Sequence, residues 1–290
     1  MKSSQSSMRS DVLTAWLFLA PAIAILGVFV LGPIVYLLYL SFTSGNFTRS
    51  GTRWVGLLNY WRLFSTPDFW QVLQNTFVFT VSTLLPSLVI PLGLAVVLDR
   101  KLPLRDVWRT AFLLPSFISL VAAGLGFRWL FQTEGPINGL LAPLGIEPIP
   151  WLGSAWAMPV LILLSIWKQL GFNLIVFLAG LQTIPRNRYE AAELDGANAG
   201  QQFWHITLPG LQPTFIFAIV TTAIFTLRSF EPVYVVTGGG PLNATNILVY
   251  YIYEQAFSQF DFGYAAAAAA VLLLATLILV YLQLRFWNEA

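Results

Sequence analysis

The sequence contains no cysteine and only one histidine, His205, in 290 residues. The absence of cysteine excludes disulfide bonds, zinc–thiolate sites and thiol catalysis. A single histidine argues against a histidine-based metal site, and we find neither a Ser-His-Asp set nor a pair of catalytic carboxylates. We therefore expect no catalytic residue, no metal site and no cofactor bound by this chain, and we interpret His205 as a contact or capping residue.

Charged residues are scarce, at 10% of the chain, whereas apolar residues make up 57%. Soluble domains contain roughly 25% charged residues. A net charge of +2 without a basic tract excludes nucleic-acid binding. The composition instead predicts an all-α, polytopic membrane protein in contact with membrane lipid.

Six apolar segments are long enough to cross a bilayer, which takes about 20 residues. They cover residues 12–42, 72–98, 110–131, 157–181, 213–237 and 264–286. The first run continues to about Leu40, which is too long for a signal peptide, so we expect an uncleaved anchor after residues 1–11. We predict one transmembrane domain over residues 12–286 and no soluble domain.

The basic residues indicate how these spans are oriented, because cytoplasmic loops carry an excess of lysine and arginine. With a cytoplasmic N-terminus, the residues on the cytoplasmic side are Lys2, Arg9, Arg100, Lys101, Arg105, Arg109, Arg186, Arg188 and Arg285. The opposite side then has Arg49, Arg53 and Arg62. We therefore predict that both termini and the loop at residues 183–209 are cytoplasmic.

That loop, between the fourth and fifth spans, predicts two short helices at a sharp bend. Pro185 can begin a helix because its missing N–H is not needed there. Residues 186–195 are mostly good helix formers, and Gly196 can end the helix in a left-handed conformation. Residues 199–206 can form the second helix, and Pro209 precedes the next span.

The same loop carries a spaced motif. Its residues are Glu190-Ala191-Ala192, Gly196, Ile206, Leu208 and Pro209. This spacing resembles the EAA loop of binding-protein-dependent ABC importer permeases, and the resemblance implies that the loop docks onto an ATPase subunit and couples it to the spans. Without the resemblance, an ordinary solvated helical hairpin would explain the segment.

Further motifs are similar to the carbohydrate-uptake branch of that family, which includes maltose-type and glycerol-3-phosphate-type permeases. They are Val55 to Tyr60, Asn75-Thr76, Leu113 to Pro115, Trp167-Lys168 and Thr237 to Pro241. The resemblance implies two ATPase subunits that bind ATP and Mg, and an extracytoplasmic solute-binding protein. It also implies a second related permease, more often a different chain than a second copy, in a bacterial inner (plasma) membrane.

An energy source is missing from the chain itself. None of its three lysines lies in a G-x-x-x-x-G-K-[ST] phosphate loop, so ATP must bind to a separate subunit.

Three cations lie in or near the apolar segments, where a charge costs at least about 2.5 kcal/mol on insertion scales. Arg128 is close to the end of its span and can reach the interface. We expect Arg228 to pair with Glu231, three residues away on the same helix face. Lys168 has no carboxylate within a helical turn, so it is the candidate to meet solute or a partner chain. The alternative for Lys168 is a buried pair or a contact with backbone carbonyls.

The residues around these charges complete a predicted solute path. They are Trp167, Phe172, Asn173, Phe230 and Tyr234, for which ordinary packing is the alternative. A glycerol-phosphate anion would suit Lys168 and Arg228, and a neutral sugar fits equally well if those cations are paired.

The sequence thus predicts the permease subunit of an ATP-driven ABC importer for a carbohydrate or glycerol-phosphate-like solute. An ion-coupled secondary transporter is the alternative, although Glu231 is the one carboxylate that we place inside a span. A membrane-embedded enzyme would need a nucleophile or a metal cluster, and the residue inventory argues against that.

Overall fold

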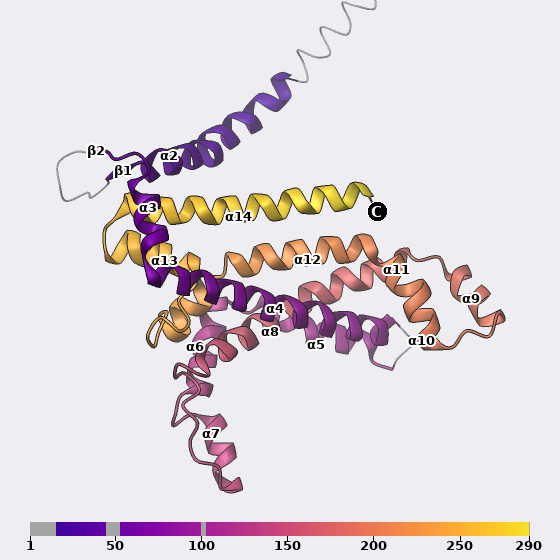
Figure 1. The fold of residues 1–290 in the computed structure, drawn as a ribbon. Coiled ribbons are helices and arrows are strands. Elements are labelled where there is room, and N and C mark those ends of the chain that lie inside the picture. Colours follow the sequence, from indigo (N-terminus) through magenta and orange to yellow (C-terminus); the bar gives the residue numbers. More distant parts are fainter. Residues whose placement is uncertain (1–15, 45–52, 100–102, 290) are drawn as a thin grey trace, which may run out of the picture. The chain divides into compact units, whose positions relative to one another are not determined.

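The computed structural model describes residues 16–44, 53–99 and 103–289. The predicted cytoplasmic N-terminus, residues 1–11, and the basic pair Arg100-Lys101 lie outside the described residues. The described part consists of helices joined by turns and loops, with one short pair of antiparallel strands in which Thr43 pairs with Trp54 (Figure 1).

The elements follow each other in this order: η1 (Gly27–Leu31), α2 (Gly32–Ser41), β1 (Thr43–Ser44), β2 (Arg53–Trp54), α3 (Leu58–Ser65), α4 (Pro67–Asp99), α5 (Arg105–Phe117), α6 (Leu120–Phe131), α7 (Pro136–Leu141), η2 (Ala142–Leu144), α8 (Ala157–Thr183), α9 (Arg186–Leu194), α10 (Ala199–Gln202), η3 (Phe203–Thr207), α11 (Leu208–Gly210), α12 (Gln212–Leu227), η4 (Val233–Thr237), α13 (Leu248–Tyr253), η5 (Glu254–Ser258) and α14 (Phe262–Glu289).

Among the described residues, four helices are long and apolar enough to cross a membrane. They are Trp16–Ser41, Pro67–Asp99, Ala157–Thr183 and Phe262–Arg285. Two bent pairs pass the same test together: Arg105–Phe117 with Leu120–Leu144 at 94°, and Ala199–Gly210 with Gln212–Leu227 at 67°. The structure therefore has four candidate spans, or up to six if each bent pair is one span.

Two of the predicted spans are not the continuous helices that hydropathy suggests. The segment 110–131 is broken because Ile118 and Ser119 have extended backbone (ψ 136° and 133°) between α5 and α6. The segment 213–237 is interrupted because α12 ends at Leu227, and helical structure resumes only at Glu231.

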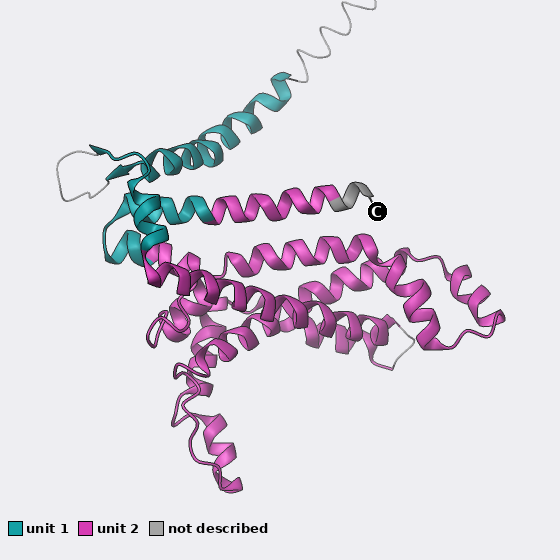
Figure 2. Cartoon of the chain, in the orientation of Figure 1, with its two compact units in different colours: residues 1–65, 254–271 teal, residues 66–253, 272–290 magenta. Residues whose placement is uncertain are grey.

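The chain forms two compact units (Figure 2). The first contains residues Met1–Ser65 and Glu254–Val271. Inside it, Asn59 Nδ2 donates to the carbonyls of Ser41 and Thr43, each at 2.9 Å, which fixes α3 to the end of α2. Arg62 pairs with Asp261 at 3.2 Å and lies over the ring of Tyr264.

The second unit, Thr66–Tyr253 with Leu272–Ala290, contains α8, which contacts α4, α5 and α12. Phe177 and Leu174 of α8 are fully buried in its core. Close packing of α5 on α8 depends on Gly171, because a Cβ atom there would lie 2.5 Å from Ser116 Oγ and 2.9 Å from Leu113 Cα. This contact fixes the end of α5 against the middle of α8.

Two of the sequence motifs meet in this unit. Asn75 Nδ2 donates to the carbonyls of Asn243 (2.7 Å) and Asn246 (3.1 Å), and Thr76 Oγ1 accepts from the amide of Leu248 at 2.9 Å. The loop that follows the Thr237 to Pro241 motif is thereby fastened to α4.

Candidate functional site

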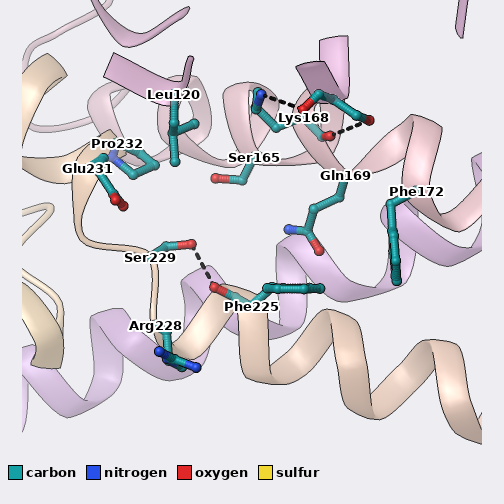
Figure 3. Close-up of a pocket in the computed structure, with 11 residues that line it drawn as sticks. Leu120, Ser165, Lys168, Gln169, Phe172, Phe225, Arg228, Ser229, Glu231 and Pro232 are labelled. Atoms are coloured by element: carbon teal, nitrogen blue, oxygen red, sulfur yellow. Dashed lines mark hydrogen bonds between the residues drawn. The ribbon is translucent and has the colours of Figure 1, made fainter. Parts of the chain in front are cut away.

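A cavity of about 520 Å³ lies between the bend that separates α5 from α6 and the end of α12 (Figure 3). Its lining residues are Ser116, Leu120, Ser165, Lys168, Gln169, Phe172, Phe225, Arg228, Ser229, Glu231 and Pro232. Four helices contribute: α5 and α6 on either side of the bend, α8, and the end of α12 with the residues after it. The cavity is thus formed by backbone that does not continue as a regular helix.

The two breaks lie at a similar distance from one end of the second unit. The beginning of α5 is tied to the end of α4, because Arg109 Nη2 donates to the Leu98 carbonyl at 3.2 Å. At ~1.5 Å per residue, α5 reaches ~20 Å from that end, α12 reaches ~24 Å, and Lys168 lies ~22 Å before Thr183. Along their own helices, the two breaks and Lys168 therefore lie at similar distances, ~20–24 Å, from the ends that lead to the neighbouring loops.

Lys168 of α8 binds the end of α5. Its ammonium donates to the carbonyl of Pro115 at 2.7 Å, to that of Ser116 at 3.4 Å, and to that of Ile118. Ser116 Oγ in turn donates to the Lys168 carbonyl at 3.2 Å. The last carbonyls of a helix have no intrahelical partner, and the helix dipole makes this end partly negative. Of the roles that the sequence left open for Lys168, the contact with backbone carbonyls is therefore the one observed.

The predicted pair of Arg228 and Glu231 on one helix face is wrong. Arg228 is the residue that ends α12, with φ −96° and ψ 7°, so the helical spacing of three residues does not apply. Among the described residues, no ion pair joins Arg228 to Glu231. Both side chains are exposed and both line the cavity, where their sticks diverge in Figure 3.

Two other predicted path residues pack inside the unit. Trp167 contacts Phe127 at a ring-centroid separation of 5.6 Å and belongs to a core cluster. Asn173 has no exposed surface, and its Nδ2 donates to the Ser87 carbonyl at 2.7 Å and to Thr222 Oγ1 at 3.0 Å. Neither residue lines the cavity.

Asn173 belongs to a polar ladder, which we define as Gln169 and Asn173 of α8 with Thr222 and Thr226 of α12. Thr222 Oγ1 donates back to Asn173 Oδ1 at 3.2 Å, and Gln169 Nε2 donates to Thr226 Oγ1 at 3.3 Å. Members of each helix are four residues apart, so they stack on one face. The polar ladder joins α8 to α12 next to the cavity, which its member Gln169 lines.

Phe230 and Tyr234 belong to an aromatic cluster with Tyr250 and Tyr253. The Phe230 ring lies 5.1 Å from Tyr234, 6.1 Å from Tyr250 and 4.9 Å from Tyr253, between centroids. A hydrogen bond with Tyr234 raises the pKa of the Tyr253 phenol above its ordinary value. Tyr234 keeps 50% of its surface exposed, and neither Phe230 nor Tyr234 lines the cavity.

Several lining residues were not predicted from the sequence. They are Ser116, Leu120, Ser165, Gln169, Phe225, Ser229 and Pro232, whereas the predicted Phe172 does line the cavity. A signal for part of this set exists, because Ser165, Gln169 and Asn173 recur every four residues and so form a polar stripe on an otherwise apolar helix. Ser116 and Leu120 have no comparable signal, since the bend between α5 and α6 brings them to the cavity.

The loop at 183–209 has the local backbone that its sequence predicts. Pro185 precedes α9, and Gly196 follows its end with φ +79°. The Gly196 amide donates to the Glu193 carbonyl and the Ala197 amide to the Ala192 carbonyl, at 3.0 and 2.8 Å, a Schellman arrangement.

The second helix of this loop begins with a capping box, in which the side chains and amides of Asn198 and Gln201 bond reciprocally. His205 Nδ1 lies 2.9 Å from the Gln201 carbonyl. The helix continues through the π-helical η3 and α11 to Gly210, so Pro209 lies inside α11.

The surface of the loop is exposed and partly apolar. Leu194 and Trp204 expose 91% and 64% of their surface, and Glu190, Ala191 and Gly196 are also exposed. On the inner side, Tyr189 OH lies 3.0 Å from Thr207 Oγ1, and Ile206 packs against the core that contains Phe177. The loop therefore has one face on the unit and one face without contacts among the described residues.

Comparison with protein families gives one direct match. The family model described as "Binding-protein-dependent transport system inner membrane component" matches residues 76–288. That range includes both breaks, the cavity and the loop.

Curated relatives are similar over most of their length. The lactose transport system permease protein LacF of Rhizobium radiobacter is 40% identical over 290 residues, covering 97% of this chain and 96% of that protein. The sulfoquinovosyl glycerol transport system permease protein SmoG of Agrobacterium fabrum is 39% identical over 260 residues, covering 89% and 84%. The arabinooligosaccharides transport system permease protein AraP of Bacillus subtilis is 36% identical over 275 residues, covering 93% and 87%.

Solved structures show the same architecture. A chain from a bacterial ABC transporter involved in the import of the acidic polysaccharide alginate matches with a TM-score of 0.85 and 25% identity, over 99% of each chain. A second alginate ABC transporter structure, in complex with an alginate pentasaccharide-bound periplasmic protein, matches with a TM-score of 0.81 and 27% identity over 96% of this chain.

Proposed function

The chain belongs to the family of binding-protein-dependent transport system inner membrane components, and from that premise we propose that its cavity lies on the path of an imported carbohydrate. The chain is a membrane permease subunit of an ABC importer, and ATP is hydrolysed on separate ATPase subunits. Relatives named for lactose, sulfoquinovosyl glycerol and arabinooligosaccharides support a carbohydrate as the solute.

The observation that carries this proposal is the cavity between two helix breaks, the bend between α5 and α6 and the end of α12 at Arg228. Transporters commonly bind solute near the middle of the bilayer, where discontinuous helices expose polar backbone groups. The lining also suits a sugar ring, because Phe172 and Phe225 meet edge to face at 5.7 Å beside hydroxyl and amide groups. Pockets of this kind combine apolar surface with a few placed polar groups.

The exposed loop is the proposed contact with the ATPase. In this loop, the exposed side chains of Leu194 and Trp204 offer apolar surface to a partner. The motif Glu190-Ala191-Ala192 precedes Leu194 in the sequence, and its Glu190 offers a carboxylate. Because α8 leads into this loop and α12 leads out of it, a displacement of the loop acts first on these two helices. We propose that closure of two ATPase subunits, which bind ATP and Mg, moves the loop and thereby opens or closes the cavity.

The remaining partners follow from the same family. We propose a second related permease, more often a different chain than a second copy, and an extracytoplasmic binding protein that delivers the solute. The complex of a similar structure with a sugar-loaded periplasmic protein supports this arrangement. A bacterial inner membrane with both termini on its cytoplasmic face completes the proposal.

An ion-coupled carrier that works alone is less well supported. Such a carrier needs intramembrane carboxylates, and Glu231 is the one carboxylate among the described residues that line the cavity. Membership of a binding-protein-dependent family also favours an ATP-driven machine.

The test is reconstitution. The chain, co-expressed with its ATPase and second permease, is placed in proteoliposomes, and ATP hydrolysis and uptake are measured with binding protein loaded with lactose, maltose or arabinobiose. Sugar-dependent stimulation of both activities is expected. Uptake by this chain alone, without ATP, would refute the ABC assignment, and stimulation by non-carbohydrate solutes only would refute the carbohydrate path.

A further inference from the structure

If the cavity lies on the solute path, as proposed above, the charges of its lining decide whether it accepts anionic or uncharged solutes. Three lining side chains can carry a formal charge: Lys168, Arg228 and Glu231. If both cations were free, the cavity would attract an anionic solute such as a sugar phosphate. Their actual partners therefore distinguish an anionic from an uncharged solute.

Lys168 is not free to bind an anion. An ammonium group has three protons and no acceptor, and three carbonyl oxygens of residues Pro115, Ser116 and Ile118 accept them. These carbonyls belong to the end of α5, which carries a partial charge of about −0.5. An anion could bind Lys168 only by displacing the groups that terminate α5.

Arg228 and Glu231 remain, and their formal charges cancel. Both are exposed, both line the cavity, and among the described residues neither forms an ion pair. They lie three residues apart around the break after α12, so this part of the lining has no net formal charge with which to attract an anion. A sugar hydroxyl, in contrast, can accept from a guanidinium and donate to a carboxylate.

We infer that this cavity selects uncharged saccharides, with Arg228 and Glu231 as a pair of hydroxyl-binding groups and Lys168 as a positioning residue that holds the end of α5. The other polar groups agree with this assignment. Ser165 and Gln169 of α8, and Ser229 after the end of α12, add uncharged donors and acceptors to the lining. The bend of 94° that Lys168 stabilises brings Ser116 and Leu120 to the cavity.

The experiment measures equilibrium binding to the purified permease–ATPase complex without binding protein, so that the selectivity of the binding protein does not enter. The probes are lactose, maltose and arabinobiose, each paired with its aldonic acid, and glycerol 3-phosphate. We expect the complex to bind the best neutral sugar at least about tenfold more tightly than its aldonate, which corresponds to ~1.4 kcal/mol.

Matched variants assign the effect to the cavity. Glu231→Gln raises the net charge of the cavity by one and should reduce or reverse the preference for the neutral sugar over its aldonate. Arg228→Gln lowers the net charge of the cavity by one and should increase that preference. Lys168→Arg, which keeps a cationic donor for the α5 carbonyls, should leave the ratio unchanged. The ratio of the two affinities, neutral sugar against aldonate, in the parent complex tests the inference even if one variant folds poorly.

Two results would overturn the inference: equal or tighter binding of an aldonate or glycerol 3-phosphate by the parent, or an unchanged ratio in both charge variants. With sugar-stimulated ATP hydrolysis intact, either result leaves the carbohydrate path standing and removes only the charge selection. No binding of any saccharide, together with no sugar-stimulated hydrolysis, would instead refute the proposed function.

Discussion

Replacement of Lys168 by methionine should loosen the junction between α5 and α6 without unfolding the rest of the chain. Methionine has a similar length and suits an apolar helix, so the main loss is electrostatic. The hydrogen bond to the Pro115 carbonyl is short, at 2.7 Å, whereas the contact with Ser116 is long, at 3.4 Å, and the one with Ile118 is exposed.

The expected magnitude follows from these three contacts. A hydrogen bond to a charged group contributes about 1.5–3 kcal/mol. Counting the short bond to the Pro115 carbonyl as the contribution that is lost, we expect a loss of about 2 kcal/mol, which corresponds to a roughly 30-fold increase in local opening.

Hydrogen–deuterium exchange of the complex in lipid nanodiscs measures this opening. Amides of residues 116–123 should exchange about 30-fold faster in Lys168→Met than in the parent, on the scale set by ~1.4 kcal/mol per tenfold. Leu163→Met, at a half-exposed position of the same helix, is the matched control and should change nothing, and Lys168→Arg should stay close to the parent. Unchanged exchange in Lys168→Met would refute the capping role of the lysine.

Three further predictions concern the loop, the cavity and the topology. Gly196→Val should leave the chain inserted but lower uptake, because a β-branched residue at φ +79° costs roughly 1–2 kcal/mol and no neighbour lies within 4 Å to cause a clash; normal uptake with normal ATPase copurification would contradict this. Arg228→Ala should keep the folded yield of the complex, since no ion pair with Glu231 is lost, while sugar binding falls. A sharp fall in yield on size-exclusion chromatography would contradict this and indicate that Arg228 and Glu231 do form an ion pair. A cysteine at Asn243 should react with an impermeant reagent from outside and one at Gln201 should not, in a chain that has no native cysteine; the reverse labelling would invert the proposed orientation.

Local features were predictable from the sequence, whereas long-range partners were not. The end of α9 at Gly196 follows from the conformational freedom of glycine, which is a property of one position. The positions of the breaks were missed because a hydropathy window averages over the two or three residues that leave helical geometry. Pro232 was a usable signal, since proline is typical of the first turn of a helix.

The site residues divide in the same way. Arg228 and Glu231 could be identified as intramembrane charges, but their pairing was wrong because it assumed a continuous helix. The partners of Lys168 are backbone carbonyls of a helix about fifty residues earlier, and no side chain in the sequence marks them. Asn173 was predicted as a residue of the solute path, but it is fully buried, joins α8 to α12 and does not line the cavity.

The polar ladder between α8 and α12 restricts how these helices can move. Its two rungs, Asn173 with Thr222 and Gln169 with Thr226, are separated by one helical turn on each helix. A relative shift of less than a turn, ~5.4 Å, would break both rungs and leave the buried Asn173 and Thr222 without their partners. A shift of a full turn would restore only one of the two rungs, so we expect small movements of the loop to carry α8 and α12 together.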